Sequence, residues 1–357
     1  MKHIYDIIAG TLQLTAIEER SKLDRMLAFA SRENPKRHFI LVNKLIGRYT
    51  PTSPKTMRDT YNLLAEKIGG GPSTYVVSFA EAATGLGAGV ADSLAKAQEA
   101  EVYFQHTTRH KLDDELWFSV DEEHSHAINH MFYKPFNSLM ESIVKSKRLI
   151  IVDDEITTGR TIRVLLLKIL QYLPDLEEII ITSVVNLLEE NNQLSGLELN
   201  IPIRYVDILK ADIHLEKKPN FNPKLPAKVN SKLTETLSAN DTGRCGMLMP
   251  YSGKIQPIKA SQSSIIIADG EHQYIPFLLA ENLEKKGIDV VFQTINRSPI
   301  LLCNEILNKY KITNRESDAE HYLYNFFPEK KSVFVISEDK YEGLMFTDEV
   351  RYHEWKY

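Results

Sequence analysis

Short β-branched, apolar runs alternate with helical segments along most of this chain, and that alternation limits its fold more than any other feature. Residues 74–81 (TYVVSFAE), 148–152 (RLIIV) and 177–185 (EEIIITSVV) each have the pattern of a strand. RLIIV is apolar on both faces, so we expect a sheet covered on both sides. Strands that alternate with helices predict parallel pairing with right-handed crossovers, and therefore an α/β fold.

The same reasoning assigns the other elements. Residues 3–18 predict a hairpin around Gly10, and Ser53-Pro54 predicts the start of a helix that stops at the glycines 69–71. We expect further strands at 38–42, 101–106, 201–209, 263–269, 289–294 and 332–339, and further helices at 24–31, 90–100, 135–146, 161–173, 275–286 and 300–310. Residues 106–127 are polar, with little periodicity, and predict a long loop.

A change in composition near residue 215 predicts two domains. Residues 215–240 contain three prolines and almost no aliphatic periodicity. We therefore expect a first domain at 1–215, a linker at 216–240 and a second, smaller α/β domain at 241–357.

The bulk properties exclude several classes of protein. The formal net charge is −5, so the chain lacks the overall positive charge that is typical of a nucleic-acid-binding protein. The two cysteines are far apart and favour a reducing compartment over a disulfide scaffold. The N-terminus is too polar for a signal peptide, and we see no run of about 18–20 apolar residues that would span a membrane. We expect a cytoplasmic protein.

Residues 149–161, LIIVDDEITTGRT, carry the strongest chemical signal. Ligands of open α/β sheets bind beyond the carboxyl ends of the strands, where Asp153 and Asp154 stand. The following turn enters a helix whose free N–H groups favour a phosphate. The carboxylates would repel that phosphate, but they suit the hydroxyl groups of a sugar. A five-carbon sugar phosphate satisfies both halves of the motif. The alternative is an acid-capped helix start with no function.

VDDEITTGRT resembles the phosphoribosyl-pyrophosphate (PRPP) motif of type I phosphoribosyltransferases. The wider chain resembles members with a C-terminal TRSP domain, found in tellurium-resistance and stress gene clusters. This wider resemblance rests on residues 32–51, 78–87, 106–109 and 122–130, and on DTGRCGM, GEHQYIPFLLAENLE, TINRSP and YLYN in the second domain. Asn296 stands where the motif that names the TRSP domain has threonine, before Arg297-Ser298-Pro299.

The resemblance implies a parallel sheet with an N-terminal hood, and it assigns roles to residues. Asp153 and Asp154 would hold the ribose hydroxyls, and their charge suits the oxocarbenium-like centre of the reaction. The 5-phosphate would lie on the turn formed by Thr157, Thr158, Gly159, Arg160 and Thr161. Mg²⁺ would be held mainly by the substrate, without a protein cage.

Two further segments resemble parts of such a site. The pyrophosphate loop would comprise Ala80, Glu81, Ala82, Ala83, Thr84 and Gly85, whose mostly small side chains let the backbone approach a ligand. Residues 106–127 resemble a flexible loop that closes over the site and excludes water. From this region Arg109 and Lys111 would clamp the pyrophosphate. His124 and His126, with His130, lack a zinc-site pattern and suit acid–base chemistry, acceptor binding or a structural role.

Other candidates are less specific. Lys44 and Arg48 follow a strand and are candidates for a phosphate of donor or acceptor, or else for surface ion pairs. In the second domain we expect a small-molecule site, or else helix caps and surface pairs. Its candidate residues are Arg244, Asp269, Glu271, Tyr274, Arg297 and Ser298.

The sequence thus predicts an enzyme that transfers ribosyl-5-phosphate from PRPP, or runs the reverse step, to build a nucleotide-like metabolite. The acceptor would be a nucleobase-like or nucleoside-like small molecule, and family members are often homodimers. The alternatives are a regulatory module that senses PRPP without transferase activity, and hydrolysis of the product by the second domain.

Overall fold

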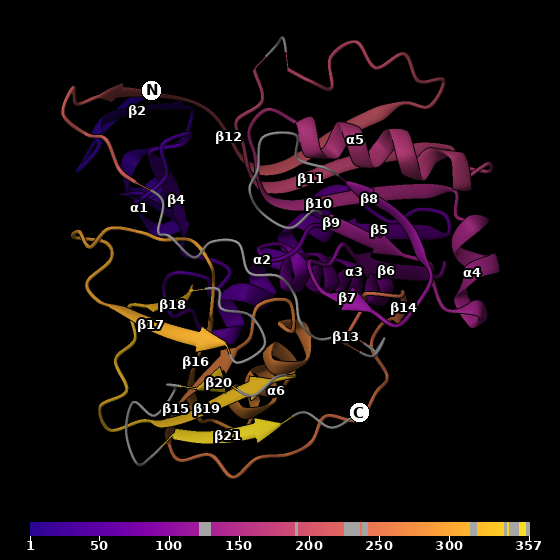
Figure 1. The fold of residues 1–357 in the computed structure, drawn as a ribbon. Helices are drawn as coiled ribbons and strands as arrows, with labels where there is room; N and C mark the ends of the chain where they lie inside the picture. The colour runs from indigo at the N-terminus through magenta and orange to yellow at the C-terminus, as the bar shows by residue number, and fades with distance from the viewer. Residues whose placement is uncertain are drawn as a thin grey trace. The chain divides into compact units, whose positions relative to one another are not determined.

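The computed structural model describes residues 1–120, 130–189, 192–224, 236–237, 242–314, 320–338, 341–342 and 350–354. By their contacts these form two compact units (Figure 1). The central unit contains residues 58–210 and 235–254, and the terminal unit contains residues 1–57, 211–234 and 255–356. Each unit therefore combines segments that are distant in sequence. The division at residues 215 and 240 stays a prediction about the organisation of the chain.

A mostly parallel sheet organises the central unit. Its strand order is β12-β11-β10-β5-β6-β14, in which all but β14 run parallel. These strands are β5 (Thr74–Ser78), β6 (Val102–His106), β10 (Arg148–Ile156), β11 (Glu178–Asn186), β12 (Ile203–Lys217) and β14 (Met247–Met249). Residues 148–152 (RLIIV) are completely buried, and β10 lies between the parallel strands β5 and β11. This burial explains why the run is apolar on both faces.

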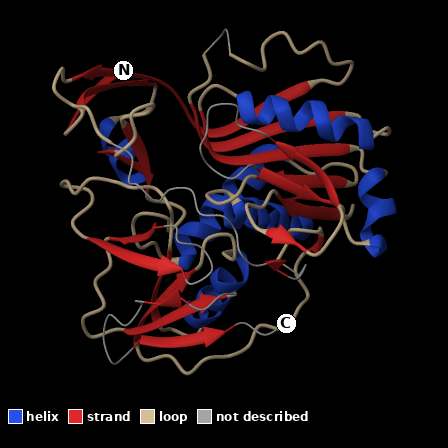
Figure 2. Ribbon diagram, in the orientation of Figure 1, coloured by secondary structure: helices blue, strands red, loops and turns tan. Residues whose placement is uncertain are grey.

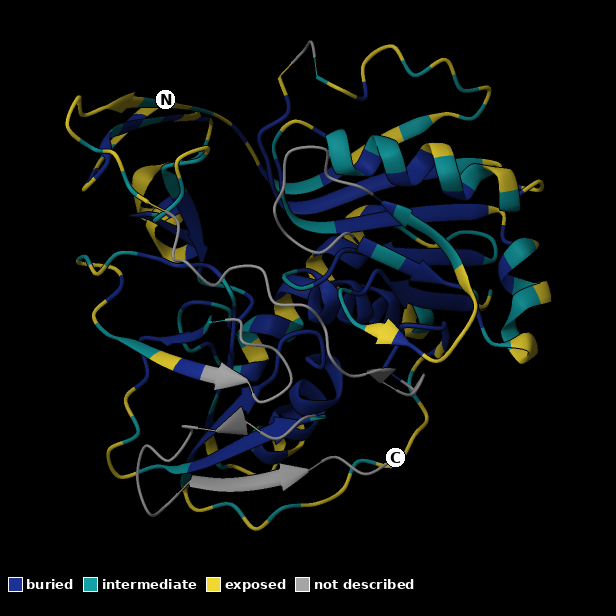
Figure 3. Cartoon of the chain, viewed as in Figure 1, coloured by how far each residue is buried: buried dark blue, intermediate teal, exposed yellow. Residues whose placement is uncertain are grey.

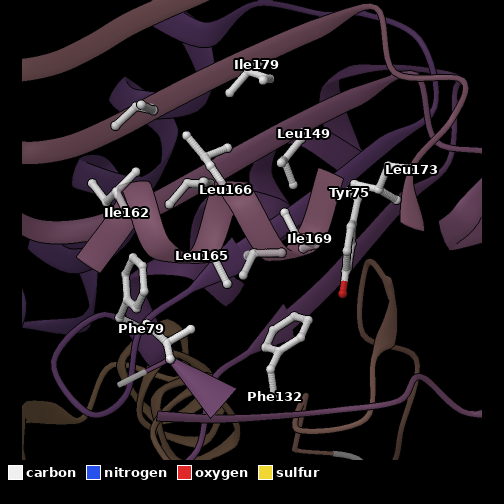
Figure 4. Close-up of a cluster of buried hydrophobic side chains, with 14 of the residues drawn as sticks. Tyr75, Phe79, Phe132, Leu149, Ile162, Leu165, Leu166, Ile169, Leu173 and Ile179 are labelled. Carbon is white, nitrogen blue, oxygen red and sulfur yellow. The ribbon is translucent and has the colours of Figure 1, made fainter. Parts of the chain in front are cut away.

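Helices cover both faces of this sheet (Figure 2), as a strand that is apolar on both faces requires. They are α2 (Pro54–Ile68), which begins in the terminal unit, α3 (Thr84–Ala97), α4 (Asn137–Val144), α5 (Arg160–Ile169) and the 3-10 turn η1 (Leu170–Tyr172). The apolar stripe of α5 packs on Leu149, Tyr75 and Ile179 of the strands, as Figure 4 shows. Helix α3 packs on β5 and β6 so closely that a Cβ at Gly87 would lie 2.5 Å from Cβ of Ser78.

The predicted long loop at 106–127 is wrong for the described part of that range. It contains β7 (Lys111–Leu112), which pairs with β13 (Thr236–Leu237), and β8 (Leu116–Val120), which pairs antiparallel with β9 (His130–Tyr133). The reason is aromatic packing: Trp117 of β8 stacks on Phe132 of β9 and on Tyr172. Tertiary contacts thus supply the order that the local sequence pattern does not show.

The N-terminal part of the terminal unit is built from two hairpins. As predicted, β1 (Lys2–Ile7) and β2 (Gly10–Ala16) pair antiparallel. The second half of β12 continues from the central unit and pairs with β2. After α1 (Arg20–Met26), strands β3 (Leu27–Ser31) and β4 (Phe39–Asn43) form the second hairpin.

The C-terminal part of this unit is a second parallel sheet of order β16-β15-β19-β21. Its elements are β15 (Ser263–Ala268), α6 (Tyr274–Lys285), β16 (Asp289–Thr294), β19 (Ser332–Ser337) and β21 (Val350–Glu354). A smaller antiparallel sheet contains β17 (Lys309–Asn314), β18 (Glu320–Tyr324) and β20 (Tyr341–Glu342). Figure 3 shows the central strands of the two parallel sheets mostly in the dark blue of buried residues, namely β5, β10 and β11 in the central unit and β15 and β19 in the terminal unit.

Two helix predictions fail in the terminal unit. Residues 27–31 form β3, because their backbone pairs with β4, and residues 300–308 contain no helix. In that segment Ile300 donates its N–H to the Tyr324 hydroxyl at 2.8 Å. Ile300 and Ile306 pack in one apolar cluster with residues of β3 and β4. In both places, long-range partners override a local helical pattern.

The predicted fold class is confirmed: the chain is a mixed α/β protein with a large, mostly parallel sheet and a second, smaller α/β region. Among the helices that the structure describes, none combines the length and apolar character needed to cross a membrane.

Candidate functional site

The acid pair lies at the carboxyl edge of the central sheet, within the last four residues of β10. The strand extends through Asp153 and Asp154 and ends at Ile156. Asp153 pairs in register with Ser183 of β11, and the preceding Val152 pairs with Ser78, the last residue of β5. The ends of three parallel strands therefore meet beside the acids, which is where ligands of such sheets bind.

The electrostatics of the pair are unusual. Both residues keep partial exposure to solvent. The pKa of the Asp153 carboxyl nevertheless lies well above its usual range, first because burial disfavours its charge and second because the neighbouring Asp154 carboxylate repels it. The N–H of Asp154 partly offsets this by donating to Oδ1 of Asp153 at 3.0 Å. A carboxyl group that keeps its proton can donate a hydrogen bond to a sugar hydroxyl as well as accept one, whereas a carboxylate only accepts.

The turn after β10 has the geometry of an anion site. Gly159 has φ +74°, a left-handed conformation, and stands directly before the first residue of α5. A Cβ at this position would lie 2.8 Å from Cγ of Leu194, so glycine is required for packing as well as for φ. The N–H of Arg160 contacts Oγ1 of Thr158 at 3.4 Å. Thr157 and Thr161 are partly exposed and Thr158 is exposed, so their hydroxyls can reach a ligand.

The predicted pyrophosphate loop follows β5 at the same edge. The Ala80–Glu81 peptide bond is cis, and α3 begins at Thr84. Glu81 and Ala82 are partly exposed, whereas Ala80, Ala83, Thr84 and Gly85 are buried. Within this loop, Glu81 and Ala82 are therefore the residues that a ligand can contact.

Polar contacts connect this loop to Arg109. The N–H of Ala80 donates to Oγ1 of Thr107 at 3.0 Å, and that oxygen lies 2.9 Å from Nδ1 of His130. Nη2 of Arg109 lies 3.1 Å from Nε2 of His130. Arginine can only donate, so Nε2 accepts, and the neutral ring must carry its proton on Nδ1 and donate it to Thr107. His130 thus joins Arg109 to the backbone of the pyrophosphate loop.

Sequence reasoning assigned neither His130 nor Thr107 this role. His130 was grouped with His124 and His126, which lie outside the described residues. Its partners depend on the bridge between Thr108 and Met131, which brings β9 against the end of β6. The only local signal is the polar pair of threonines that follows β6. Lys111 is exposed in β7, two residues beyond Arg109.

Three further predicted residues make other contacts. Lys44 and Arg48 belong to the terminal unit, where Lys44 pairs with Glu305 at 3.5 Å and Arg48 lies over the ring of Tyr49. Arg244, predicted with the second domain, belongs to the central unit. It is 1% exposed and donates to Oγ1 of Thr242. Asp269, Glu271, Tyr274, Arg297 and Ser298 all belong to the terminal unit.

Sequence comparison then identifies the family. Residues 26–212, more than half of the chain, match a family described as phosphoribosyl transferase. The chain belongs to this phosphoribosyltransferase family. Residues 241–347 match the TRSP domain that is found C-terminal to this transferase. Both matches confirm the resemblance predicted from the motifs. No curated protein matches the chain.

Solved structures similar to this phosphoribosyltransferase include two adenine phosphoribosyltransferases. That of Thermoanaerobacter pseudethanolicus is 17% identical, with a TM-score of 0.36, and the match covers 54% of this chain and 99% of that one. That of Trypanosoma brucei, in complex with AMP, pyrophosphate and ribose-5-phosphate, is 15% identical, with a TM-score of 0.35 and coverages of 55% and 82%. A hypothetical protein from Neisseria gonorrhoeae with bound ppGpp is 12% identical, with a TM-score of 0.28 and coverages of 47% and 85%.

Proposed function

We propose that this chain transfers ribosyl-5-phosphate from PRPP to a nucleobase-like or nucleoside-like acceptor, or catalyses the reverse reaction, at the carboxyl edge of the central sheet. One observation carries the proposal. In a member of the phosphoribosyltransferase family, two adjacent carboxyl groups at the end of β10 are followed, five residues after Asp154, by a left-handed glycine at a helix N-terminus. These two parts suit the sugar and the phosphate of one ligand.

The turn is the proposed phosphate site. Backbone N–H groups from Thr157 to Thr161 lie at the start of α5, where the helix dipole favours an anion. The threonine hydroxyls add donors around the same turn. Helix dipole and hydroxyls together hold the 5-phosphate without requiring a lysine.

The acid pair is the proposed ribose site. Asp153 and Asp154 would accept hydrogen bonds from the ribose hydroxyls. When the bond at C1 of the ribose breaks, positive charge develops on the ring, and fixed negative charge nearby stabilises it. In a site withdrawn from water this interaction is stronger than in bulk solvent.

The pyrophosphate of PRPP would meet the loop at Glu81 and Ala82 and the guanidinium of Arg109. His130 fixes that guanidinium against the loop through Thr107, so loop and clamp are positioned as one piece. Mg²⁺ fits this site because the partly exposed Asp154 carboxylate and the phosphate oxygens of PRPP are hard ligands of the kind it prefers. When bound, the ion would neutralise charge on the departing pyrophosphate.

Pyrophosphate release tests the proposal. Purified protein with PRPP, Mg²⁺ and a mixture of nucleobases and nucleosides is expected to release pyrophosphate. The double variant Asp153→Asn/Asp154→Asn should lose at least about a hundredfold of this rate, the scale of removing one electrostatic contact to the transition state.

The matched control is Glu177→Gln/Glu178→Gln, an adjacent acid pair at the amino end of β11, on the opposite edge of the sheet. It should keep the wild-type rate. PRPP binding without any turnover would instead indicate a sensing module. Equal rates in the wild type and the aspartate variant would contradict the proposal.

A further inference from the structure

The topology of the C-terminal sheet indicates where a ligand could bind. From β15 the chain passes through α6 to β16 on one side, and it later returns to β19 on the other side of β15. The strand order therefore reverses between β15 and β19. In open parallel sheets the loops beyond such a reversal leave toward opposite faces and open a ligand crevice between them.

Polar side chains occupy this point of reversal. Asp269 follows β15 directly, Ser337 ends β19, and the Ser337 hydroxyl donates to Oδ2 of Asp269. Asp269 and Glu271 are only 6% and 3% exposed, and His272 beside them is also buried. Buried carboxylates are costly and are retained where they have a specific partner. Both carboxyl groups therefore stand at the reversal point itself, in a position withdrawn from bulk solvent.

The loop between these acids borders unfilled space. Gly270 is buried and has φ +34°, yet a Cβ added there would meet no described atom within 4 Å. At Gly159 the same test gives a contact of 2.8 Å. The backbone at Gly270 can therefore be approached closely by a ligand, as the glycines of nucleotide-binding turns are.

Cationic and amide groups reach the same edge from β16. Ala268, the last residue of β15, pairs in register with Thr294, the last of β16, and accepts a hydrogen bond from Ile295 N–H at 2.9 Å. Arg297 follows, partly exposed, and its Nε donates to Nε2 of His321 at 3.1 Å. The Asn296 side-chain nitrogen is buried and has no hydrogen-bond partner among the described residues. An unpaired buried donor is costly unless a ligand satisfies it.

These groups together define the ligand. Arg297 and the N-terminus of the 12-residue helix α6 favour an anion, and arginine suits the fork of phosphate oxygens. Asp269 and Glu271 would repel a bare anion, but they accept hydrogen bonds from hydroxyl groups. A ligand that satisfies all of them carries both a phosphate and vicinal hydroxyls.

We propose that the edge formed by the ends of β15, β16 and β19 is a second binding site, and that it takes a phosphorylated ribosyl compound. The ligand class deepens the proposed function, on which it rests: a ribosyl phosphate is what the first site would produce. The chain would then carry one site that makes a phosphoribosylated product and one that receives it.

Binding of ribose 5-phosphate to the full-length protein, measured by calorimetry, tests this proposal. Wild type is expected to bind two equivalents, and Asp153→Asn/Asp154→Asn should keep one. Adding Arg297→Gln to that variant should weaken the remaining site at least tenfold. Adding Lys285→Gln, which removes an exposed cation at the far end of α6, should leave it unchanged.

Asp269→Asn should weaken the same site, and thermal melting of each variant verifies folding. Because Arg297 is partly exposed, its variant remains informative if Asp269→Asn does not fold. Inorganic phosphate should bind at least tenfold more weakly than ribose 5-phosphate, and equal affinity would refute the sugar half of the proposal.

The outcomes separate the two sites. No binding to Asp153→Asn/Asp154→Asn, or binding that Arg297→Gln leaves intact, would overturn the second site. One equivalent that survives the aspartate changes and disappears with Arg297→Gln, in a protein that releases no pyrophosphate from PRPP, would refute the first site and retain the second.

Discussion

The two proposed sites both lie at the carboxyl edge of a parallel sheet, but they are built from different parts. In the central unit the acids and the phosphate turn are consecutive in sequence, and Gly159 packs tightly against Leu194. In the terminal unit the acids are more deeply buried, a Cβ at Gly270 would meet no described atom within 4 Å, and the cation Arg297 comes from another strand end. One site is a continuous motif, and the other is assembled by the fold.

The two glycines provide the largest expected difference between the sites. Gly159→Ala should lower the free energy of unfolding by about 2–5 kcal/mol, because left-handed strain of about 1–2 kcal/mol adds to overpacking of about 1–3 kcal/mol. Gly270→Ala should cost only the strain, about 1–2 kcal/mol. Urea unfolding of both variants measures this difference. Equal losses in the free energy of unfolding would show that the tighter packing at Gly159 does not affect stability.

The contacts of His130, which belong to the first site alone, provide the next largest expected effect. His130→Phe keeps a ring against Phe79 but removes both ring nitrogens that join Arg109 to Thr107. A hydrogen bond to a charged group contributes about 1.5–3 kcal/mol, so we expect kcat/KM for PRPP to fall by at least about tenfold.

Ribose 5-phosphate provides the control for that variant, since it lacks the pyrophosphate that Arg109 is proposed to clamp. Its affinity for His130→Phe should remain that of the wild type. A parallel loss of affinity for both ligands would mean that His130 only supports the fold.

The smallest expected effect concerns the charge of Asp153. Its folded-state pKa is raised by burial and by Asp154, so the folded protein binds this proton more tightly than the unfolded chain does. Its contribution to stability is therefore fully present below about pH 4, the unfolded pKa, and is lost as pH rises through the raised folded value.

Asp153→Asn removes this penalty. The melting temperature of the variant should equal that of the wild type in acid and exceed it at neutral pH, although the activity of the variant falls. Melting temperatures across pH 4–8 measure the effect. A variant that melts below the wild type at neutral pH would contradict a raised pKa.

The contrast between the sites also explains what the sequence could predict. The strand, acid pair, turn and helix at 148–169 follow from local pattern and chemistry, because every part is a neighbour in sequence. The Arg109–His130 contact could not be predicted, because it depends on the pairing of β9 with the end of β6. Ser337 beside Asp269 depends in the same way on the order of parallel strands.

The failed predictions have the same physical origin. Residues 27–31 have a helical pattern but pair with β4. At the start of the segment 300–308, Ile300 and Leu301 donate their N–H groups to the distant partners Tyr324 and Ser31. Local propensity is a weak guide wherever long-range pairing decides the backbone.

A crystal structure of the protein with PRPP and Mg²⁺ would examine the first site at the level of atoms. We expect the 5-phosphate at about 2.7–3.2 Å from backbone N–H groups of residues 157–161, with the ribose hydroxyls on Asp153 and Asp154. PRPP bound elsewhere, with this turn unoccupied and the two carboxyl groups away from the sugar, would contradict the proposed transferase site.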